Sequence, residues 1–367
     1  MKQQEYFDFG SLENLRDILE YEKSRNVFLV TGRDSYEKCG AKEKIETILG
    51  NSEIGFTRFC DFFSNPNIKD IQKGCDSFKK KNYDLIMGVG GGSVIDTAKA
   101  IKLFNCPKAE KIPLIAIPTT AGSGSEATWF VVFYKGKEKQ SWGNETITLP
   151  NYSVIDPKLT MSLSRKVAAS TGMDALAQAV ESYWCINSTD ESKRIARQSI
   201  KLTLKNLERA VNGKGKRARG NMALSSNLAG KAINLTRTTA CHSIAYPITS
   251  YFDVAHGHAV GLTLGEMLTY NSKVTEGDCN DGRGFEYARK TINELVEIFE
   301  VGCVDGTSRR IKNLMDSIGL ETRLSEIEIG EQGREIIIDK GFKPERVKNN
   351  PRILTRNGLR KILEKIA

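Results

Sequence analysis

The sequence predicts an α/β domain with a parallel sheet over residues 1–158 and an all-α domain over residues 159–367. Up to about residue 158, short β-rich apolar runs alternate with helical patterns, and beyond Pro157 the apolar period changes to that of helices. The length of 367 residues also suits two domains of ordinary size, each with its own core.

Four runs in the first half have the composition of buried strands. They are VFLVTG (27–32), DLIMGVG (84–90), PLIAIPTT (113–120) and YSVID (152–156). Continuous apolar strands separated by helices are typical of a parallel sheet that is covered on both faces. Such sheets bind ligands at the carboxyl ends of their strands, so we expect the first half to bind a nucleotide. The second half contains few β-rich runs.

Composition excludes several classes of protein. No apolar run approaches the roughly 18 residues of a membrane span, and MKQQEYFDFGSLENL at the start lacks the apolar core of a signal peptide. We therefore expect a cytoplasmic protein, in which the eight cysteines stay reduced. The cysteines contain no CxxC pair, which argues against a zinc finger. The net charge of +9 is dispersed without interleaved aromatic residues, which favours a solvated basic face over a nucleic-acid partner.

A glycine-rich turn follows the second predicted strand. Gly90, Gly91, Gly92 and Ser93 open a helix, and such a turn lets phosphate groups approach backbone N–H groups at the positive end of the helix. A tight structural turn explains the same glycines equally well, and the spacing is not the GxGxxG fingerprint. Asp96 and Lys99 follow, and their separation of three residues by itself fits a surface pair.

Two further strand ends bear on which nucleotide binds. The next strand leads into a second hydroxyl-rich loop, PTTAGSGSEAT (118–128), and two such loops at adjacent strand ends suit a dinucleotide. The first strand ends in Gly32 and Arg33, where NAD-specific folds often hold an acidic residue. Space and a guanidinium favour the 2′-phosphate of NADPH over NADH, unless Arg33 points to solvent.

Asp174 and Gln178 are the first candidates for a metal site. They lie four residues apart and so share one face of a helix, for which Ser170 or Thr171 is the expected N-cap. Taken alone, Asp174 is an acidic residue of a first helical turn, where the helix dipole favours it.

The histidines strengthen the case for metal. His242, His256 and His258 are the only three in the chain and fall within 17 positions. We expect His242 on a helix that Pro247 ends, and His256 on the loop that returns from this helix, just before Gly257. Two histidines from separate elements and one carboxylate can form an open site for Fe²⁺ or Zn²⁺.

Taken together, these motifs resemble the iron-type, or group III, alcohol dehydrogenase family. The resemblance covers most of the chain and implies an N-terminal dinucleotide-binding domain, a helical C-terminal domain and a catalytic metal in the cleft between them. It also implies NAD(P)-dependent interconversion of an aldehyde and an alcohol. The motifs, in order, are VFLVTG, GGGSVIDTAK, PTTAGSGSEAT, PNYSVIDPKLTMSL, TGMDALAQAVESYW, HSIAYPITSYFDVAHGHAV and KNNPRILT.

The resemblance assigns roles by position. The phosphate contacts fall on Gly90, Gly91, Gly92 and Ser93, and the other residues that line the cofactor site are Asp96, Thr119, Thr120 and Ser125. The metal ligands of the family, an aspartate and three histidines, fall on Asp174, Gln178, His242 and His256.

This chain departs from the family pattern at two of its functional positions. Gln178 stands where the family usually has histidine, and an amide oxygen is a poorer ligand for a transition metal. Tyr246 stands where the family often has a histidine credited with proton relay. His258 is a possible substitute for that relay, against the alternative that it lies behind the site or in solvent.

The region before His242 resembles the branch of the family that includes phosphonoacetaldehyde reductases. Lys231, Arg237, Thr238 and Thr239 precede the ligand, and a phosphonate prefers a guanidinium and hydroxyl donors. Arg237 is the first choice for that contact, with pairing to an acidic side chain as the alternative. The resemblance thus implies a small anionic aldehyde as substrate.

Three other functions stay open at this point: a general aldehyde reductase, a cyclase of the dehydroquinate-synthase type, and a degenerate homologue without catalysis. The stretches GMDALAQAVE and HGHAV resemble the alcohol dehydrogenases more closely than the cyclases. We expect a homodimer with neither a nucleic-acid partner nor membrane attachment.

Overall fold

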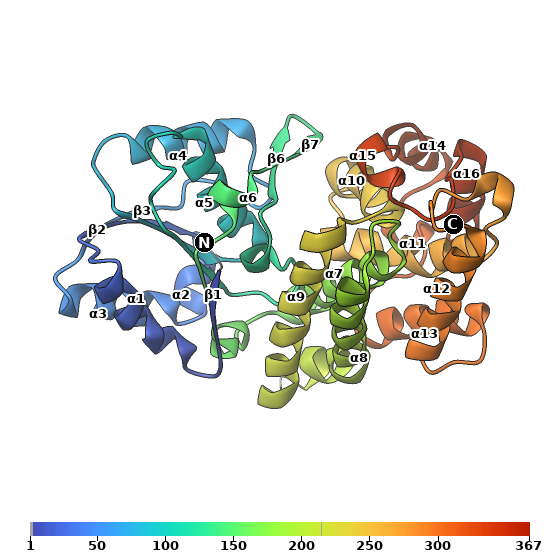
Figure 1. Cartoon of the computed structure of the whole chain (residues 1–367), viewed down its shortest axis with the longest axis horizontal. Helices are drawn as coiled ribbons and strands as arrows, with labels where there is room; N and C mark the ends of the chain where they lie inside the picture. The colour runs from blue at the N-terminus through green and yellow to red at the C-terminus, as the bar shows by residue number, and fades with distance from the viewer. Residues whose placement is uncertain (1–2, 214) are drawn as a thin grey trace. The chain divides into compact units, whose positions relative to one another are not determined.

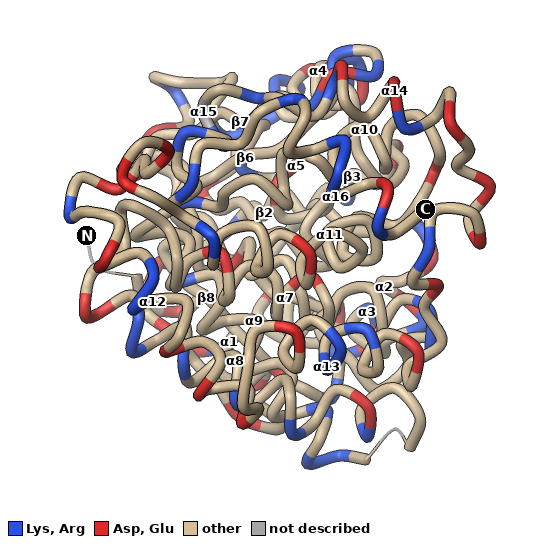
Figure 2. Tube along the Cα trace, turned by 90° about the vertical axis from the view of Figure 1, so that its right-hand side faces the viewer, with Lys and Arg blue, Asp and Glu red and all other residues tan. Residues whose placement is uncertain are grey.

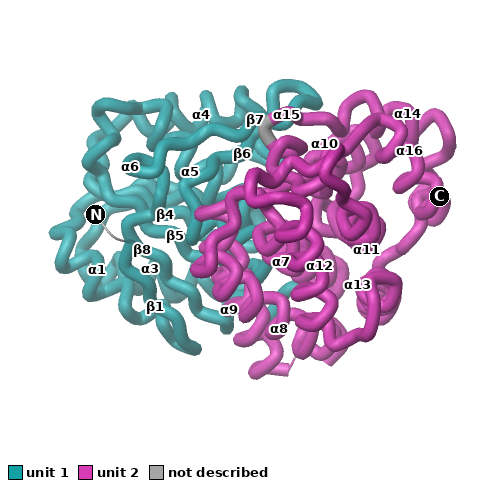
Figure 3. Tube along the Cα trace, turned by 45° about the vertical axis from the view of Figure 1, so that its right-hand side comes forward, with its two compact units in different colours: residues 1–163 teal, residues 164–367 magenta. Residues whose placement is uncertain are grey.

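The structure is a computed structural model that describes residues 3–213 and 215–367, so that Met1, Lys2 and Lys214 lie outside the described residues. The chain divides into two compact units (Figure 3), an α/β unit that ends at Leu163 and a helical unit that begins at Ser164. The sequence placed this boundary after residue 158. A parallel sheet in the first unit and helices in the second confirm the predicted fold class.

Six parallel strands form the sheet of the described α/β unit, in the order β1-β8-β5-β4-β2-β3 (Figure 1). The four predicted strands correspond to β2, β4, β5 and β8. The edge strands β1 and β3 escaped prediction because nearly all of their residues are exposed or only half-buried, so they lack an apolar run. The strands are β1 (Gln4–Phe7), β2 (Asn26–Thr31), β3 (Gly55–Phe59), β4 (Leu85–Gly90), β5 (Leu114–Pro118) and β8 (Tyr152–Ile155), and β6 (Val131–Lys135) pairs with β7 (Glu138–Trp142) as a separate hairpin.

Helices cover both faces of the sheet (Figure 1). Successive side chains of a strand point to opposite faces, so Val27 and Leu29 of β2 pack into one core with α1 and α3. Phe28 and Val30 pack into the other core with α4 and α5. The helices are α1 (Leu15–Tyr21), α2 (Ser35–Lys38), α3 (Ala41–Asn51), α4 (Ile68–Phe78), α5 (Gly92–Phe104) and α6 (Glu145–Thr148).

The helical unit is built around α7, whose side chains are buried almost without interruption from Ala168 to Trp184. Alanine and glycine make up much of α7, and small side chains let α8, α9 and α11 pack closely on different sides of it. The helices are α7 (Arg165–Trp184), α8 (Asp190–Asn212), α9 (Lys216–Thr236), α10 (Ala240–Phe252), α11 (His256–Asn271), α12 (Phe285–Ile298), α13 (Val304–Ser317), α14 (Glu331–Lys340), α15 (Pro344–Val347) and α16 (Arg356–Lys365).

Charged residues of both signs are interspersed along the chain (Figure 2). Among the described residues, no helix combines the length and the apolar character that crossing a membrane requires.

Candidate metal and nucleotide sites

Three helices of the helical unit bring Asp174, His242 and His256 together. The residues come from α7, α10 and α11, and one ligand atom from each lies within 4.8 Å of the other two. His242 Nε2 is 3.4 Å from Asp174 Oδ1, and the two imidazole rings lie 5.5 Å apart at an angle of 73°. A carboxylate and two imidazoles in this arrangement suit a divalent transition metal.

Gly257 explains how His256 comes so close to Asp174. It is the second residue of α11, and a Cβ atom added there would collide with the carbonyl oxygen of Ser170 and lie 2.8 Å from Asp174 Cβ. Only a residue without a side chain lets the start of α11 rest directly on α7.

The polar atoms of this cluster fit a metal ion. Asp174 and His242 are 7% and 5% exposed. Neither Asp174 Oδ1 nor His242 Nε2 has a hydrogen-bond partner within the described ranges. Buried polar atoms without partners are unfavourable, and a cation between them would satisfy both.

Glu181 supports the cluster from behind, and the sequence analysis missed it. Its fully buried carboxylate accepts hydrogen bonds from the Thr239 hydroxyl at 2.8 Å, the Cys241 N–H at 2.7 Å and His242 Nδ1. With Nδ1 held by Glu181, Nε2 faces Asp174 as the free ligand atom. The spacing Asp174, Gln178, Glu181 places all three on one helix face and could have revealed the role of Glu181.

Charge couples His242 to its acidic neighbours. Burial works to lower the pKa of His242, but the carboxylates of Glu181 and Asp174 outweigh it and raise this pKa to about 9. Burial works to raise the pKa of Glu181, but His242 and the hydrogen bonds from Thr239 hold it below its ordinary value. The raised pKa of His242 and the lowered pKa of Glu181 share one cause, which is the attraction between the two side chains.

Three further predicted residues lie on the same helices. Gln178 is buried one turn after Asp174 on α7, and Tyr246 follows one turn after His242 on α10. The Tyr246 ring stacks on that of His256, with 6.3 Å between centroids and an angle of 24°. His258 instead donates from Nε2 to the Glu321 carbonyl at 2.7 Å, and burial lowers its pKa. This hydrogen bond gives His258 a structural role, so the structure does not support it as a proton relay.

The structure corrects three local predictions about these helices. α7 begins at Arg165 with Ser164 as its N-cap, so Asp174 lies in mid-helix, and Thr171 donates back to the Val167 carbonyl instead of capping. Pro247 does not end α10, which continues to Phe252, because the burial of this helix from Ala240 to Thr249 offsets the backbone hydrogen bond that a proline removes. His256 does not lie in a loop, because it is the first residue of α11.

The residues predicted for the substrate lie on α9 or directly follow it. Lys231 is half-buried on that helix, and Arg237 ends it with an exposed side chain and a φ of 71°. Thr239 accepts from Trp184 Nε1 at 2.9 Å and donates to Glu181, so its hydroxyl is engaged within the protein. Thr238 is buried, and its carbonyl accepts from Asn349. Only Lys231 and Arg237 remain as partly or fully exposed cations of this group.

In the α/β unit, three strand ends meet at one edge of the sheet. Thr31 pairs in register with Val89, and Gly90 with Pro118, so the loops that follow β2, β4 and β5 begin side by side. No side chain caps α5, whose N-cap is Gly91, and the first N–H groups of a helix have no partner within it. This helix end, with Ser93 in its first turn, fits a phosphate group.

The glycines of the first loop let the second loop approach. A Cβ added at Gly91 would lie 3.2 Å from the Thr120 side chain, and one at Gly92 would lie 2.7 Å from Ser123 Oγ. Thr119 donates its N–H to the Gly90 carbonyl at 3.0 Å. The two loops therefore form one packed edge.

Asp96 and Ser125 hold these loops together. Ser125 donates to Asp96 Oδ1 at 2.5 Å, and the Val132 N–H donates to Asp96 Oδ2 at 3.1 Å. Both side chains are buried, and burial raises the pKa of Asp96. Asp96 and Lys99 do form a pair, with 3.8 Å between Oδ1 and Nζ, but it is buried and not at the surface. The side-chain oxygens of Asp96 and Ser125 already bond each other.

Arg33 is paired and does not extend freely into solvent. Its guanidinium lies 3.0 Å from Asp61 and 4.0 Å from the centre of the Phe63 ring, while 41% of its side chain stays exposed. Gly32 precedes it, and the Gly32 carbonyl accepts from Arg58 at 3.0 Å.

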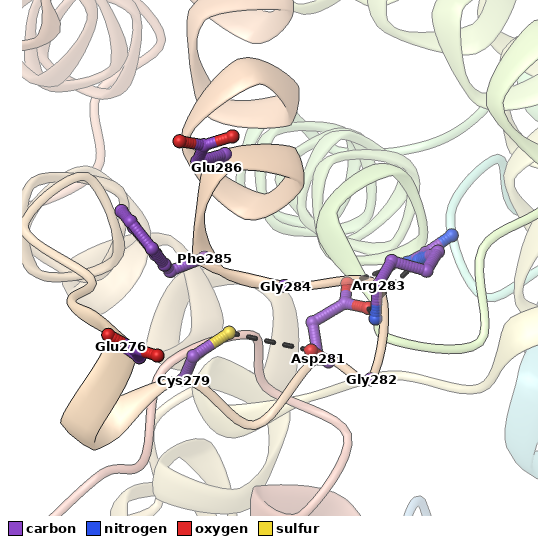
Figure 4. Close-up of a pocket in the computed structure, with 8 residues that line it drawn as sticks. All are labelled: Glu276, Cys279, Asp281, Gly282, Arg283, Gly284, Phe285 and Glu286. Carbon is purple, nitrogen blue, oxygen red and sulfur yellow. Dashed lines mark hydrogen bonds and ion pairs between the residues drawn. The ribbon is translucent and has the colours of Figure 1, made fainter.

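A pocket elsewhere in the helical unit contains none of the predicted site residues (Figure 4). Its lining includes Cys279, Asp281 and Arg283. The Arg283 guanidinium donates to Asp281 and to the carbonyls of Ser188 and Cys185. These bonds tie the pocket wall to the end of α7, which makes Arg283 a structural residue.

Comparison with known proteins identifies the family. The model described as "Iron-containing alcohol dehydrogenase" matches residues 3–157, and "Fe-containing alcohol dehydrogenase family, C-terminal" matches residues 168–367. The chain belongs to the iron-containing alcohol dehydrogenase family. It is therefore an enzyme of the oxidoreductase class, and it is related to NAD(P)-dependent aldehyde and alcohol dehydrogenases.

Individual relatives of this iron-containing alcohol dehydrogenase differ in their substrates. The chain is 32% identical to phosphonoacetaldehyde reductase of Streptomyces viridochromogenes over 304 residues, which cover 76% of this chain and 75% of that protein. It is 28% identical to the NADPH-dependent butanol dehydrogenase of Clostridium saccharobutylicum, over 98% of this chain and 95% of that one. Sulfoacetaldehyde reductase of Bifidobacterium kashiwanohense, solved with NAD⁺, superposes with a TM-score of 0.85 at 28% identity, covering 100% and 97% of the two chains.

Proposed function

We propose that this protein reduces a small anionic aldehyde to its alcohol with NAD(P)H, with phosphonoacetaldehyde to 2-hydroxyethylphosphonate as the first candidate reaction. The grouping of Asp174, His242 and His256 carries the proposal, because it offers a divalent metal three ligands and leaves positions open. Phosphonoacetaldehyde and sulfoacetaldehyde, named for two relatives, are both small aldehydes with an acidic group.

A divalent metal would supply a Lewis acid that polarises the carbonyl, and the nicotinamide would supply the hydride. Asp174, His242 and His256 would hold the metal, with the Gln178 amide oxygen as a weak fourth ligand. Tyr246, whose ring lies beside that of His256, or water would give a proton to the oxygen that becomes the alcohol. Water then returns a proton to the Tyr246 phenolate.

Arg237 and Lys231 are the residues proposed to bind the anionic group. The Arg237 side chain is exposed, and Arg237 lies shortly before α10, the helix that carries His242. A guanidinium can donate two parallel hydrogen bonds to a phosphonate, which an uncharged aldehyde cannot accept.

The nucleotide is proposed to bind at the start of α5, with NADPH preferred over NADH. The uncapped helix end and the Gly91–Thr120 contact support the phosphate position, and Arg33 at the end of β2 supports the preference. We propose Fe²⁺ or Zn²⁺ as the metal and the cytoplasm as the location, where the eight free thiols would stay reduced.

The deciding experiment measures nucleotide oxidation by metal-free protein after addition of Fe²⁺ or Zn²⁺. Phosphonoacetaldehyde, sulfoacetaldehyde and propanal are compared in the wild type, Arg237→Ala and Lys231→Ala. Arg209→Ala, which removes an exposed arginine on α8, is the matched control. We expect kcat/KM for the phosphonate to exceed that for propanal by about tenfold or more, and this preference to disappear in Arg237→Ala, to decrease in Lys231→Ala and to persist in Arg209→Ala.

A general aldehyde reductase is the second candidate, which the similarity to butanol dehydrogenase favours. Equal rates with propanal and phosphonoacetaldehyde would support it. Conversion of a substrate without net consumption of nucleotide would indicate a cyclase, and absence of metal binding and turnover would indicate a non-enzymatic homologue.

A further inference from the structure

Lys99 is fully buried in the middle of α5, and its ammonium lies among five oxygen atoms. Nζ is 2.6 Å from the Ser125 carbonyl, 2.7 Å from the Thr128 carbonyl and 3.0 Å from the Phe130 carbonyl. The hydroxyls of Ser125 and Thr128 lie at 3.0 and 3.3 Å. All five acceptors belong to the β5–β6 connection, residues 119–130.

This connection has little regular structure to hold it. It contains one short 3-10 turn (Ser125–Ala127) between β5 and β6. Carbonyl groups of an irregular segment need donors from elsewhere when they are buried. The Lys99 ammonium has three N–H groups and so can donate to the carbonyls of three residues. Lys99 thus provides the hydrogen bonds that a neighbouring strand would provide in a sheet.

α5, the helix that carries Lys99, contacts the β5–β6 connection at three points along its length. At its start, Gly91 and Gly92 lie against Thr120 and Ser123. One turn later Asp96 accepts from Ser125, and Lys99 follows two turns after the start. These contacts with residues of α5 therefore fix the position of the β5–β6 connection beside the proposed phosphate site.

We propose that Lys99 is a positioning residue for the dinucleotide, which anchors the β5–β6 connection onto α5 and so pre-orders the loop pair that receives the cofactor. The inference rests on the proposed function, because it takes the start of α5 as the nucleotide site. Lys99 itself touches no ligand in this role. Pre-ordering lowers the entropy that binding must otherwise remove, so its loss appears as weaker binding.

The test replaces Lys99 and a matched lysine of the same helix. Lys102 is also nearly fully buried on α5, with 2% exposure, and within the described part of the chain its ammonium makes no hydrogen bond. Isothermal titration calorimetry with NADPH and NADH is carried out on the wild type, Lys99→Met and Lys102→Met. We expect Lys99→Met to weaken nucleotide binding about tenfold or more and Lys102→Met to change it less than about twofold.

Two further readouts separate positioning from general damage. Hydrogen exchange without nucleotide should accelerate at amides 119–130 in Lys99→Met, while the Zn²⁺ affinity of the helical unit stays unchanged. The KM for nucleotide should rise, with kcat at saturating nucleotide within about twofold of the wild type. Lys99→Gln, which keeps two donors on a shorter chain, should bind nucleotide with intermediate affinity and serves if Lys99→Met does not fold.

The outcomes distinguish this inference from the proposed function. If the wild type binds neither nucleotide, both are wrong. If the wild type binds and the Lys99 variants bind equally well, or if Lys102→Met loses as much affinity as Lys99→Met, the positioning role alone is overturned.

Discussion

Gln178 sets how firmly the three ligands of the helical unit can hold a metal ion. It occupies a buried position one turn after Asp174, where the family usually has histidine. A neutral amide oxygen donates less electron density to Fe²⁺ or Zn²⁺ than an imidazole nitrogen does.

Replacing Gln178 with histidine should therefore tighten metal binding by about tenfold or more. Competition with a chromophoric chelator measures the change. Gln198→His adds a histidine at an exposed position of α8 and should leave the affinity unchanged. An unchanged affinity in Gln178→His would show that the fourth position does not face the ion.

His242 makes metal binding dependent on pH. Below its pKa of about 9, the His242 ring carries a second proton. This proton competes with the metal for Nε2. The apparent affinity for Zn²⁺ should rise about tenfold per pH unit up to pH 9 and then level off. In Glu181→Gln the leading cause of the raised pKa is gone, so the plateau should begin at a lower pH. A plateau at the same pH in both proteins would contradict this coupling.

The grouping of Asp174, His242 and His256 could be predicted from the sequence because histidine is rare here and the spacing of Asp174 and Gln178 is helical. Glu181 was missed although its spacing places it on the helix face of Asp174 and Gln178, because spacing alone does not show that its carboxylate is buried against His242. The engagement of Asp96 and Ser125 was likewise invisible, because it joins residues 29 positions apart.

At the scale of the element, the contact between α7 and α11 determines the geometry of the metal site. Both helices are nearly continuously buried, so a shift of one moves its ligand relative to the other. Gly257 lies at the point of closest approach.

Gly257→Ala should therefore reduce metal affinity and destabilise the fold by about 2 kcal/mol or more. Gly172→Ala is the control for stability alone, because its Cβ would collide with Leu207 of α8 and not with α11. Gly277→Ala, with open space around it, should affect neither property. Equal metal affinity in Gly257→Ala and Gly172→Ala would show that the α7–α11 contact does not position the ligands.

Elements with a buried apolar face were predictable, and those without one were not. β2, β4, β5 and β8 are buried along nearly their whole length, which produces the apolar runs seen in the sequence. The start of α7 was misplaced because Ser170 and Thr171 are typical capping residues. Ser164 is a residue of the same kind, and nothing in the sequence distinguishes it from them. Only the tertiary packing of α7 decides between them.

For the molecule as a whole, the net charge of +9 should attract an anionic substrate. Raising NaCl from roughly 0.02 to 0.3 M shortens the screening length and should lower kcat/KM for phosphonoacetaldehyde about threefold or more. Propanal is uncharged and should show no such decline. A parallel decline with both substrates would point to weakened nucleotide binding and not to substrate attraction. The expected homodimer stays a prediction that sedimentation can measure.

We expect the fluorescence of Trp184 to respond to metal binding at the proposed site. The chain has three tryptophans, and Trp129 and Trp142 belong to the α/β unit. Trp184 donates to Thr239, whose hydroxyl donates to Glu181, which in turn holds His242. Metal binding removes the proton from His242, so the field at the indole should change and shift its fluorescence emission, a signal that Trp184→Phe would abolish. Through this hydrogen-bonded chain, we expect the fluorescence of one indole to report whether His242 has bound a metal ion.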